Sequence, residues 1–390
     1  MMAVTVREDV AARIDAARDE LFELSRRLHA HPEISGEERQ ASAWLAEALE
    51  RHGFRVERGV AGLETAFVAT AGEGSPILGI VAEYDALPGI GHACGHNLIA
   101  TSALGAAIGA RDAVLAAGGT LKVFGTPAEE IGRGKQPMID AGVFAGTEAA
   151  LMFHPFPGPE GKASLSTGSL AISLFDITYH GKTAHAAVAP WNGVNALDAV
   201  VQLFVGIGLL RQQLQPDTRL HGIITNGGQA FNVIPHLTAA RVGVRSPDGT
   251  YLREVVTRLR DIAEAAARAS GTRVEIEPVM FMDSIRPNAT LTDVVSRNLG
   301  ALGLAVQPPR PTPASTDFGN LSQILPAVSF GIPTHPPEAG LHTPLAHAVG
   351  TTDRAHEGMI VAAKAIALSI ADLARDATLR ARARQEIDNG

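Results

Sequence analysis

One short segment of the sequence carries three side chains that can bind a metal ion. His92, Cys94 and His96 alternate with small residues in the segment 91–97, so Cys94 and His96 can face the same pocket. A thiolate beside an imidazole suits zinc or a neighbouring first-row metal. The alternative is that Cys94 is a buried free thiol packed as a small hydrophobe. The glycines and the asparagine of the segment argue against a plain core strand, so we favour a metal loop.

Two adjacent carboxylates form a second candidate. Glu129 and Glu130 follow an apolar run at 121–124. One carboxylate of such a pair can bind a metal while its neighbour takes a proton from a bound water, whose pKa the metal lowers towards ~7. The alternative is a solvated glutamate pair that opens a helix. Because Thr126 and Pro127 place the pair at the end of a strand, we favour the catalytic interpretation.

Four further histidines could complete a site for two metal ions. His154 follows the apolar run 149–153; alone, it would more often be a hydrogen-bonded structural residue. His335, His342 and His347 lie together near the C-terminus. A two-metal site needs a ligand from this region, but spacing does not choose among the three.

The elements that must position these residues are apolar runs at 77–82, 121–124 and 149–153. Each reads as a buried strand, and an alanine-rich helix at 98–117 separates the first two. Strands that alternate with helices predict a mostly parallel α/β sheet, whose ligands gather at its carboxyl edge. The candidate ligands follow the strands and therefore belong to that edge.

The pattern changes near residue 170. Between 171 and 285 the expected elements follow the order β-α-β-β-α-β, which is typical of a ferredoxin-like α+β unit. We therefore expect a catalytic domain at 1–170 and 286–390, interrupted by an inserted domain at 171–285. A length of 390 residues agrees with two domains, since single cores rarely exceed about 250–300 residues.

Two local expectations concern the ends of the catalytic domain. Ser35 and Glu38 have the spacing of a capping box before a helix. At the other end, a closing helix runs from 353 to about 379, and the charged tail 380–390 is expected to fray.

The composition limits the classes of molecule that this protein is expected to bind. The formal charge of −8 and the lack of a long basic run give no electrostatic footprint for nucleic acid. No apolar run reaches the roughly 18 residues of a membrane span, and the N-terminus lacks a signal-peptide core. A single cysteine excludes an internal disulfide and fits a reducing compartment. These features predict a cytoplasmic protein with a small-molecule substrate, no nucleic acid and no membrane.

The ordered motifs resemble the M20 metallopeptidase/amidohydrolase family. The resemblance is greatest to its Cys-Gly-His loop group, which contains N-acyl amino acid amidohydrolases, auxin-conjugate hydrolases and subunits of p-aminobenzoyl-glutamate hydrolase. The match covers nearly the whole chain, and the motifs are specific when taken together. They are Leu28-His29-Ala30-His31-Pro32-Glu33-Ile34, Asp85-Ala86-Leu87-Pro88, the Cys94 loop, Pro127-Ala128-Glu129-Glu130, His154, Gly181-Lys182-Thr183-Ala184-His185-Ala186-Ala187, Asn232-Val233-Ile234-Pro235 and Leu341-His342-Thr343-Pro344.

The resemblance implies two divalent metal ions per subunit, zinc in the first place and manganese or cobalt as alternatives. It implies Glu129 as general base and acid, and Asp85 as a carboxylate that orients a ligand. His342 is preferred to His335 and His347 because the family's last ligand precedes Ser or Thr. The implied ligands are Cys94, His96, Glu130, His154 and His342.

For the inserted domain, the resemblance implies a dimerisation or lid role in a homodimer. His185 would reach the active site of the partner subunit and stabilise the oxyanion of the reaction. Asn232 would lie near the substrate. The alternatives are a surface histidine on a hairpin and a turn asparagine before Pro235.

Two points depart from the family pattern or remain open. Asn97 stands where the family usually has Asp, which puts any role of a carboxylate there in doubt. Asn97-Leu98 and Glu83-Tyr84-Asp85 resemble the p-aminobenzoyl-glutamate-hydrolase and dipeptidase branch. An arginine that binds a substrate carboxylate could be Arg241, Arg245 or Arg286.

The expected function is that of a metal-dependent amidohydrolase. It would cleave the amide bond of N-acyl, N-aroyl or aminoacyl amino acids with metal-activated water. One alternative is an M20 dipeptidase whose substrates carry a free amino group. A second is a non-catalytic metal-binding protein of the same fold.

Overall fold

The computed structural model describes residues 2–389, which form two compact units. The smaller unit is Ser169–Ser284 with Thr312–Gly319, and the larger unit holds the rest of the chain. The segment Thr312–Gly319 was expected in the larger domain. It belongs to the smaller unit, where the Leu170 amide donates to the Ala314 carbonyl and Arg245 donates to the Ser315 hydroxyl.

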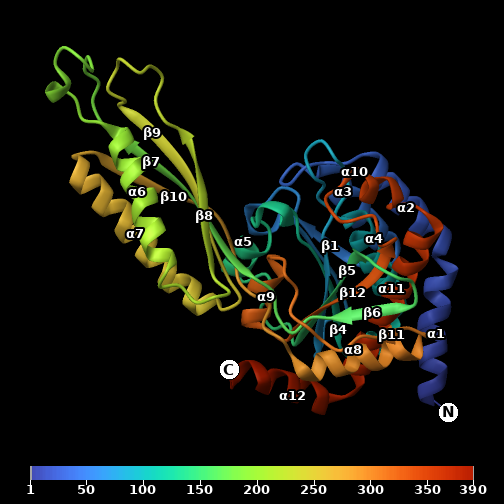
Figure 1. Cartoon of the computed structure of the whole chain (residues 1–390). Helices are drawn as coiled ribbons and strands as arrows, with labels where there is room; N and C mark the ends of the chain where they lie inside the picture. Colours follow the sequence, from blue (N-terminus) through green and yellow to red (C-terminus); the bar gives the residue numbers. More distant parts are fainter. Residues whose placement is uncertain (1, 390) are drawn as a thin grey trace. The chain divides into compact units, whose positions relative to one another are not determined.

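The larger unit is built on one mixed sheet of eight strands in the order β1-β2-β4-β3-β5-β12-β6-β11 (Figure 1). The four central strands, β4, β3, β5 and β12, run parallel, as expected, and antiparallel pairs flank them. The strands are β1 Arg55–Arg58, β2 Phe67–Ala71, β3 Ile77–Ala82, β4 Thr120–Gly125, β5 Ala149–Pro157, β6 Lys162–Leu165, β11 Ala305–Val306 and β12 Ala327–His335.

Two long helices pack side by side on the central strands. They are α4 His96–Ala116 and α11 Asp353–Arg375. By length and composition α4 could cross a membrane, but 72% of its most apolar window is buried inside the protein, so it is a core helix. The other helices of the larger unit are α1 Met2–Ala16, α2 Arg18–Ala30, α3 Arg39–Arg51, α5 Lys135–Asp140, α8 Ala289–Ala301, α9 Phe318–Ile324, which begins in the smaller unit, α10 Pro344–Val349 and α12 Ala377–Asp388, with short 3-10 helices at Val60–Gly62 and Glu129–Ile131. A third 3-10 helix, Pro190–Asn192, lies in the smaller unit.

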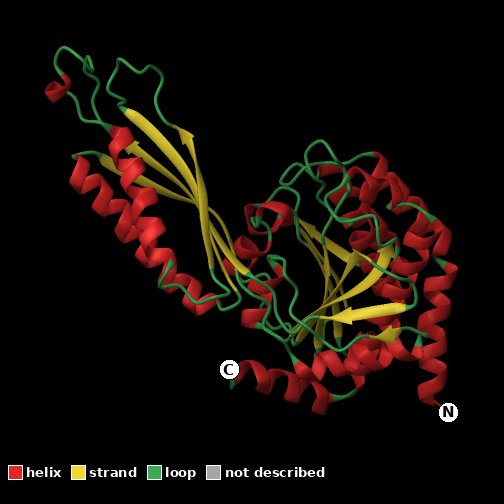
Figure 2. Cartoon of the chain, in the orientation of Figure 1, coloured by secondary structure: helices red, strands yellow, loops and turns green. Residues whose placement is uncertain are grey.

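The smaller unit has a four-stranded antiparallel sheet in the order β10-β7-β9-β8. Figure 2 shows its two long helices on one face of this sheet. The element order along the chain is β-α-β-β-α-β, as expected for a ferredoxin-like unit. The elements are β7 Ala171–His180, α6 Ala196–Arg211, β8 Arg219–Asn226, β9 Leu237–Ser246, α7 Gly249–Ser270 and β10 Arg273–Met282.

The expectation that the C-terminal tail frays is wrong for its described residues. The expected closing helix ends at Arg375, and Asp376 accepts two amide hydrogen bonds as the N-cap of α12. The Glu386 carboxylate of α12 then accepts hydrogen bonds from the Ala289 and Thr290 amides at the start of α8. The first backbone amides of a helix need hydrogen-bond acceptors outside the helix. The charged tail supplies such an acceptor and so caps the start of α8.

Candidate metal and catalytic site

The expected ligands of the larger unit meet at the carboxyl edge of its parallel strands. The loop after β3 carries Cys94 and ends at His96, the first residue of α4. Glu129 and Glu130 follow β4, and His154 lies in β5. The carboxyl edge is where α/β sheets bring together residues from distant segments.

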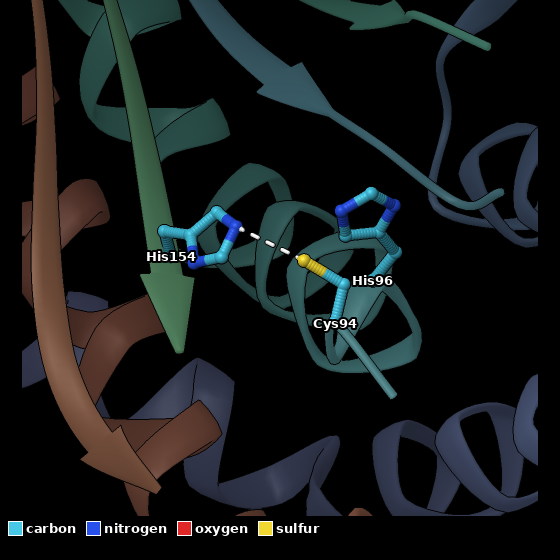
Figure 3. A group of neighbouring side chains, drawn as sticks. All are labelled: Cys94, His96 and His154. Atoms are coloured by element: carbon cyan, nitrogen blue, oxygen red, sulfur yellow. Dashed lines mark hydrogen bonds between the residues drawn. The ribbon is translucent and has the colours of Figure 1, made fainter. Parts of the chain in front are cut away.

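The distances between donor atoms are those of side chains that share cations. The Cys94 Sγ atom lies 3.7 Å from His154 Nε2 (Figure 3). Glu130 lies between two imidazoles: its Oε1 atom is 3.8 Å from His96 Nε2, and its Oε2 atom is 3.6 Å from His342 Nε2. Ligands about 2.1 Å from one tetrahedral zinc ion lie about 3.4 Å apart, so these atoms fit two neighbouring ions.

Two of these atoms are buried without a hydrogen-bond partner. They are His96 Nε2 and Glu130 Oε1. Buried polar atoms are almost always hydrogen-bonded, so atoms without partners that face one another mark a place for a cation. The other nitrogen of each imidazole is already engaged: His96 Nδ1 is 2.8 Å from Asp85 Oδ1, and His154 Nδ1 is 2.7 Å from the Pro155 carbonyl. Metal-binding histidines typically hold their second nitrogen in this way.

Asp85 is buried and accepts several hydrogen bonds. Besides His96, it accepts the Ser35 hydroxyl at 2.7 Å and the Glu130 amide at 3.0 Å. Burial raises the pKa of Asp85, but His96 and these hydrogen bonds outweigh burial and bring the pKa down to about 2. Asp85 is thus ionised and fixes both a ligand side chain and the backbone of the glutamate pair.

The expected capping box at Ser35 and Glu38 is wrong, because both side chains point to the site. Glu38 is the N-cap residue of α3 but makes no side-chain cap. Its Oε1 atom accepts the Ala128 amide at 2.8 Å, and its Oε2 atom accepts the Thr65 hydroxyl. Ala128 has a φ of 55°, a left-handed backbone conformation that is costly for a residue with a side chain. Glu38 therefore holds the turn that presents Glu129.

Glu129 is buried and faces the ligands. It is 6% exposed, and its Oε2 atom lies 3.9 Å from His96 Nε2. One oxygen each from Glu129 and Glu130 and a nitrogen of His96 lie within 4.8 Å of one another. A buried carboxylate placed beside the ligands can take and return a proton.

The thiol of Cys94, the single cysteine, needs a bound cation to become a thiolate ligand. Burial raises the pKa of the Cys94 thiol well above its usual value. A buried thiol without a cation therefore stays protonated, whereas a bound metal ion deprotonates it. Cys94 is a suitable metal ligand and a poor nucleophile.

Of the three C-terminal histidines, the structure brings His342 to the ligands. His342 has a φ of 62°, and its amide donates to the Ala93 carbonyl at 2.9 Å, which ties its loop to the metal loop. The His335 ring is buried against the Thr334 hydroxyl, at 2.8 Å. The ring of His347 stacks on His29 with centroids 4.0 Å apart. Among the described residues, neither His335 nor His347 belongs to a group of candidate ligands.

Asn97 has a structural role. Its side-chain amide donates to the Ser25 hydroxyl at 3.0 Å and to the Gly350 carbonyl at 3.1 Å. A carboxylate could not donate these hydrogen bonds, so the difference from the family's usual Asp ties α4 to its neighbours.

In the smaller unit, the structure places His185 and Asn232 on adjacent exposed loops. The Ala186 amide donates to the Asn232 carbonyl at 3.0 Å. His185 Nδ1 accepts the amides of Ala187 and Val188, each at 3.2 Å. Because Nδ1 is an acceptor, the neutral ring carries its proton on Nε2, which makes that nitrogen a ready donor.

The three candidate arginines differ in their partners. Arg241 forms a two-pronged ion pair with Asp176 at 2.7 Å. Arg286 donates to the carbonyls of Glu386 and Ile387 and so helps to hold α12. Arg245 donates to the Ser315 hydroxyl at 3.1 Å.

Glu83 is a residue at the site that the motifs did not indicate. Glu83 follows β3 directly, is fully buried, and directs Oε2 towards His96 Nε2 at 3.9 Å. Its position two residues before Asp85 was the available signal, because alternate residues of an extended chain point to the same side.

The mixed sheet and the groups of candidate ligands at the carboxyl edge of its parallel strands define an α/β protein with a candidate metal site. Residues 79–368 match the model of peptidase family M20/M25/M40, and the chain belongs to this family, as the motifs predicted. The chain is therefore a hydrolase of that family, and the non-catalytic alternative is not favoured.

Similar proteins come from mammals and bacteria. The chain is 38% identical to a mouse Xaa-Arg dipeptidase over 342 residues, covering 82% of this chain and 77% of the relative. It is 31% identical to one of the subunits of p-aminobenzoyl-glutamate hydrolase from Escherichia coli, covering 96% and 93%. It is 28% identical to an N-acetyl-L-cysteine deacetylase of Bacillus subtilis, covering 82% and 81%.

Solved structures share the fold. An aminobenzoyl-glutamate utilization protein from Klebsiella pneumoniae aligns with a TM-score of 0.75 at 20% identity, covering 92% of this chain and 97% of that chain. A dinuclear metal-binding M20 peptidase from Bacillus subtilis aligns with a TM-score of 0.72 at 23% identity, covering 92% and 99%. At these identities the likeness establishes a shared mixed α/β fold.

Proposed function

We propose that this protein is a two-metal amidohydrolase that releases an amino acid from an N-acyl, N-aroyl or aminoacyl amino acid. The observation that carries the proposal is the convergence of buried ligand atoms without partners, His96 Nε2 and Glu130 Oε1, beside the buried carboxylate of Glu129. Such a set is costly to bury without a cation.

The donor set fits two divalent ions. Cys94 groups with His96 and His154 and also with Glu130 and His342, and this set of a thiolate, imidazoles and a carboxylate suits zinc, with manganese or cobalt as alternatives. When bound, such ions lower the pKa of water and polarise the scissile carbonyl.

Side chains of the protein then transfer the proton, orient a metal ligand and stabilise the oxyanion. Glu129 accepts a proton from the attacking water and returns it to the leaving amine. Asp85 keeps His96 in the tautomer that leaves Nε2 free. His185 would reach the active site of the partner subunit and donate a hydrogen bond from Nε2 to the oxyanion that develops on the carbonyl there.

The substrate class follows from the similar proteins and from the chemistry together. The relatives are named for an Xaa-Arg dipeptide, p-aminobenzoyl-glutamate and N-acetyl-L-cysteine, which are all amides of amino acids. The common element is an amide whose leaving amine belongs to an amino acid. We favour this broad class over a strict requirement for a free amino group on the acyl side.

We also propose that the smaller unit joins two copies into a homodimer. Its edge strand β8 exposes Ile223 (64%), and the neighbouring α6 exposes Val205 (57%) and Leu209 (72%). An open edge beside an apolar helix face is a surface that a second copy can cover by extending the sheet. Val205→Glu should turn the dimer into a monomer in light scattering, whereas Thr257→Glu, at an exposed position of α7, should leave it a dimer. A dimeric Val205→Glu protein would contradict this interface.

The function is tested with matched substrate pairs. The protein, loaded with Zn²⁺, Mn²⁺ or Co²⁺, is assayed on N-acetyl amino acids, on p-aminobenzoyl-glutamate and on dipeptides with a free or acetylated amine. Release of the amino acid from the acylated member supports the proposal. Hydrolysis of the free-amine member alone would establish a dipeptidase, and no hydrolysis of any pair would reject the proposal.

A further inference from the structure

A buried ion pair lies against the candidate metal site and has no part in the mechanism above. Glu83 and Lys135 are both fully buried, and Lys135 Nζ donates to Glu83 Oε1 at 2.6 Å. Burying two charges is unfavourable unless their geometry and hydrogen bonding are very good. The burial of this pair therefore needs an explanation. The direction of the second carboxylate oxygen of Glu83 gives one.

That oxygen, Glu83 Oε2, is buried and has no hydrogen-bond partner. It lies 3.9 Å from His96 Nε2, which is also without a partner. This separation is too long for a hydrogen bond but suits two ligands of one ion. Glu83 and Glu129 also offer oxygen atoms within 4.8 Å of each other.

Three carboxylates thus surround the same imidazole nitrogen. Oxygen atoms of Glu83, Glu129 and Glu130 lie at 3.9, 3.9 and 3.8 Å from His96 Nε2. Lys135 offsets one of these negative charges, and the remaining repulsion is relieved if a further cation lies among the carboxylates.

We propose that Glu83 is a further metal-facing carboxylate, which adds an oxygen ligand to the ion held by His96, and that Lys135 is its positioning residue. Lys135 binds one oxygen of Glu83 and so turns the other towards the ion. The inference rests on the proposed two-metal function and adds a consequence to it. Because carboxylate oxygen suits manganese, the added ligand should favour Mn²⁺, and removing it should cost more affinity for Mn²⁺ than for Zn²⁺.

The test measures metal binding. Glu83→Gln alone leaves the buried lysine charge behind, so the main variant is Glu83→Gln/Lys135→Met, which removes both charges and keeps their approximate volume. Glu148→Gln is the matched control, because it breaks a partly buried ion pair with Arg380 at the other end of the strands. Metal-free proteins are titrated with Mn²⁺ and Zn²⁺, and Co²⁺-loaded proteins are compared by visible absorption, which reports the coordination of the ion.

The wild type and Glu148→Gln should bind two ions with the same affinities. The double variant should keep one ion at wild-type affinity, bind the other about 10–100-fold more weakly, and lose more affinity for Mn²⁺ than for Zn²⁺. Its cobalt absorption bands should change while the thiolate-to-cobalt band persists. A double variant with both affinities and the spectrum unchanged would overturn the role of Glu83.

A second measurement needs no variant. In a crystal structure of the Mn²⁺-loaded wild type, Glu83 Oε2 should lie about 2.0–2.5 Å from an ion. A distance beyond about 3.5 Å from both ions would reject the inference and leave the two-metal function standing. A wild type that binds no metal in the titration would instead reject the proposed function itself.

Discussion

The two units of this protein hold their functional side chains in opposite ways. In the larger unit, Cys94, His96 and Glu129 are at most 7% exposed, and a hydrogen bond to Asp85 fixes the His96 imidazole. His342 is the exception, with a side chain that is 53% exposed. In the smaller unit, His185 and Asn232 lie on exposed loops, and their neighbour Phe231 is 99% exposed. Metal ligands have to be fixed and desolvated before the cation arrives. A residue that acts on a substrate can stay exposed until a substrate or a second copy covers it.

The largest effect in the comparison of the two units is expected at the buried Glu129 of the larger unit. Glu129→Ala should lower kcat by roughly 10²–10⁴ or more, because the general base and acid is lost, and should leave the metal content unchanged. Steady-state kinetics with metal analysis of the same sample measures both quantities. Full activity in this variant would remove the assigned base.

The exposed loop should matter for turnover but not for metal binding. His185→Ala should lower kcat by about 10²–10³ because the oxyanion loses a donor, with metal content and stability as in the wild type. His180→Ala is the control, because His180 lies in the same unit and pairs with Glu275 at the sheet surface. Equal activity of the two variants would show that His185 is an ordinary surface residue.

A substitution of Asp85, which hydrogen-bonds the ligand His96, should change the affinity for metal. Asp85→Asn should weaken metal binding about 10–100-fold, because His96 loses the carboxylate that holds its tautomer. Saturating metal should restore much of the activity, and titration with and without a competing chelator measures the shift. If kcat stayed low at saturating metal, Asp85 would have a direct catalytic role instead.

The smallest effect is expected far from the site. Glu386→Ala should lower the free energy of unfolding by about 1–2 kcal/mol, because its carboxylate accepts two backbone amides at the start of α8. Asp388→Ala breaks an exposed ion pair with Arg384 and should cost less than about 0.5 kcal/mol. Equal stabilities in urea denaturation would mean that the tail frays after all.

The ends of apolar strands were predictable because they leave a local signal. Strands at 77–82, 121–124 and 149–153 could be recognised from short apolar runs, and the parallel sheet then gathered their ligands at one edge. The family motifs indicated His342, and the structure brings this histidine to the ligands.

The supporting residues were not predictable from local patterns, because their partners are distant in the sequence. Glu38 accepts the amide of Ala128, 90 positions away, and Lys135 meets Glu83 across 52 positions. Ser35 and Glu38 match a capping box locally, but tertiary contacts with Asp85 and Ala128 take precedence. The helix of the charged tail depends on contacts with α8 that no local pattern reveals.

The central claim is that the candidate ligands of the larger unit hold two divalent ions on which hydrolysis depends. Its most direct test is to strip the purified protein with a chelator and add Zn²⁺, Mn²⁺ or Co²⁺ stepwise, measuring bound metal and amino acid release at each step. The account predicts no activity without metal, recovery as metal binds, and saturation at two ions per chain. Full hydrolysis by the metal-free protein, or no specific metal binding, would contradict it.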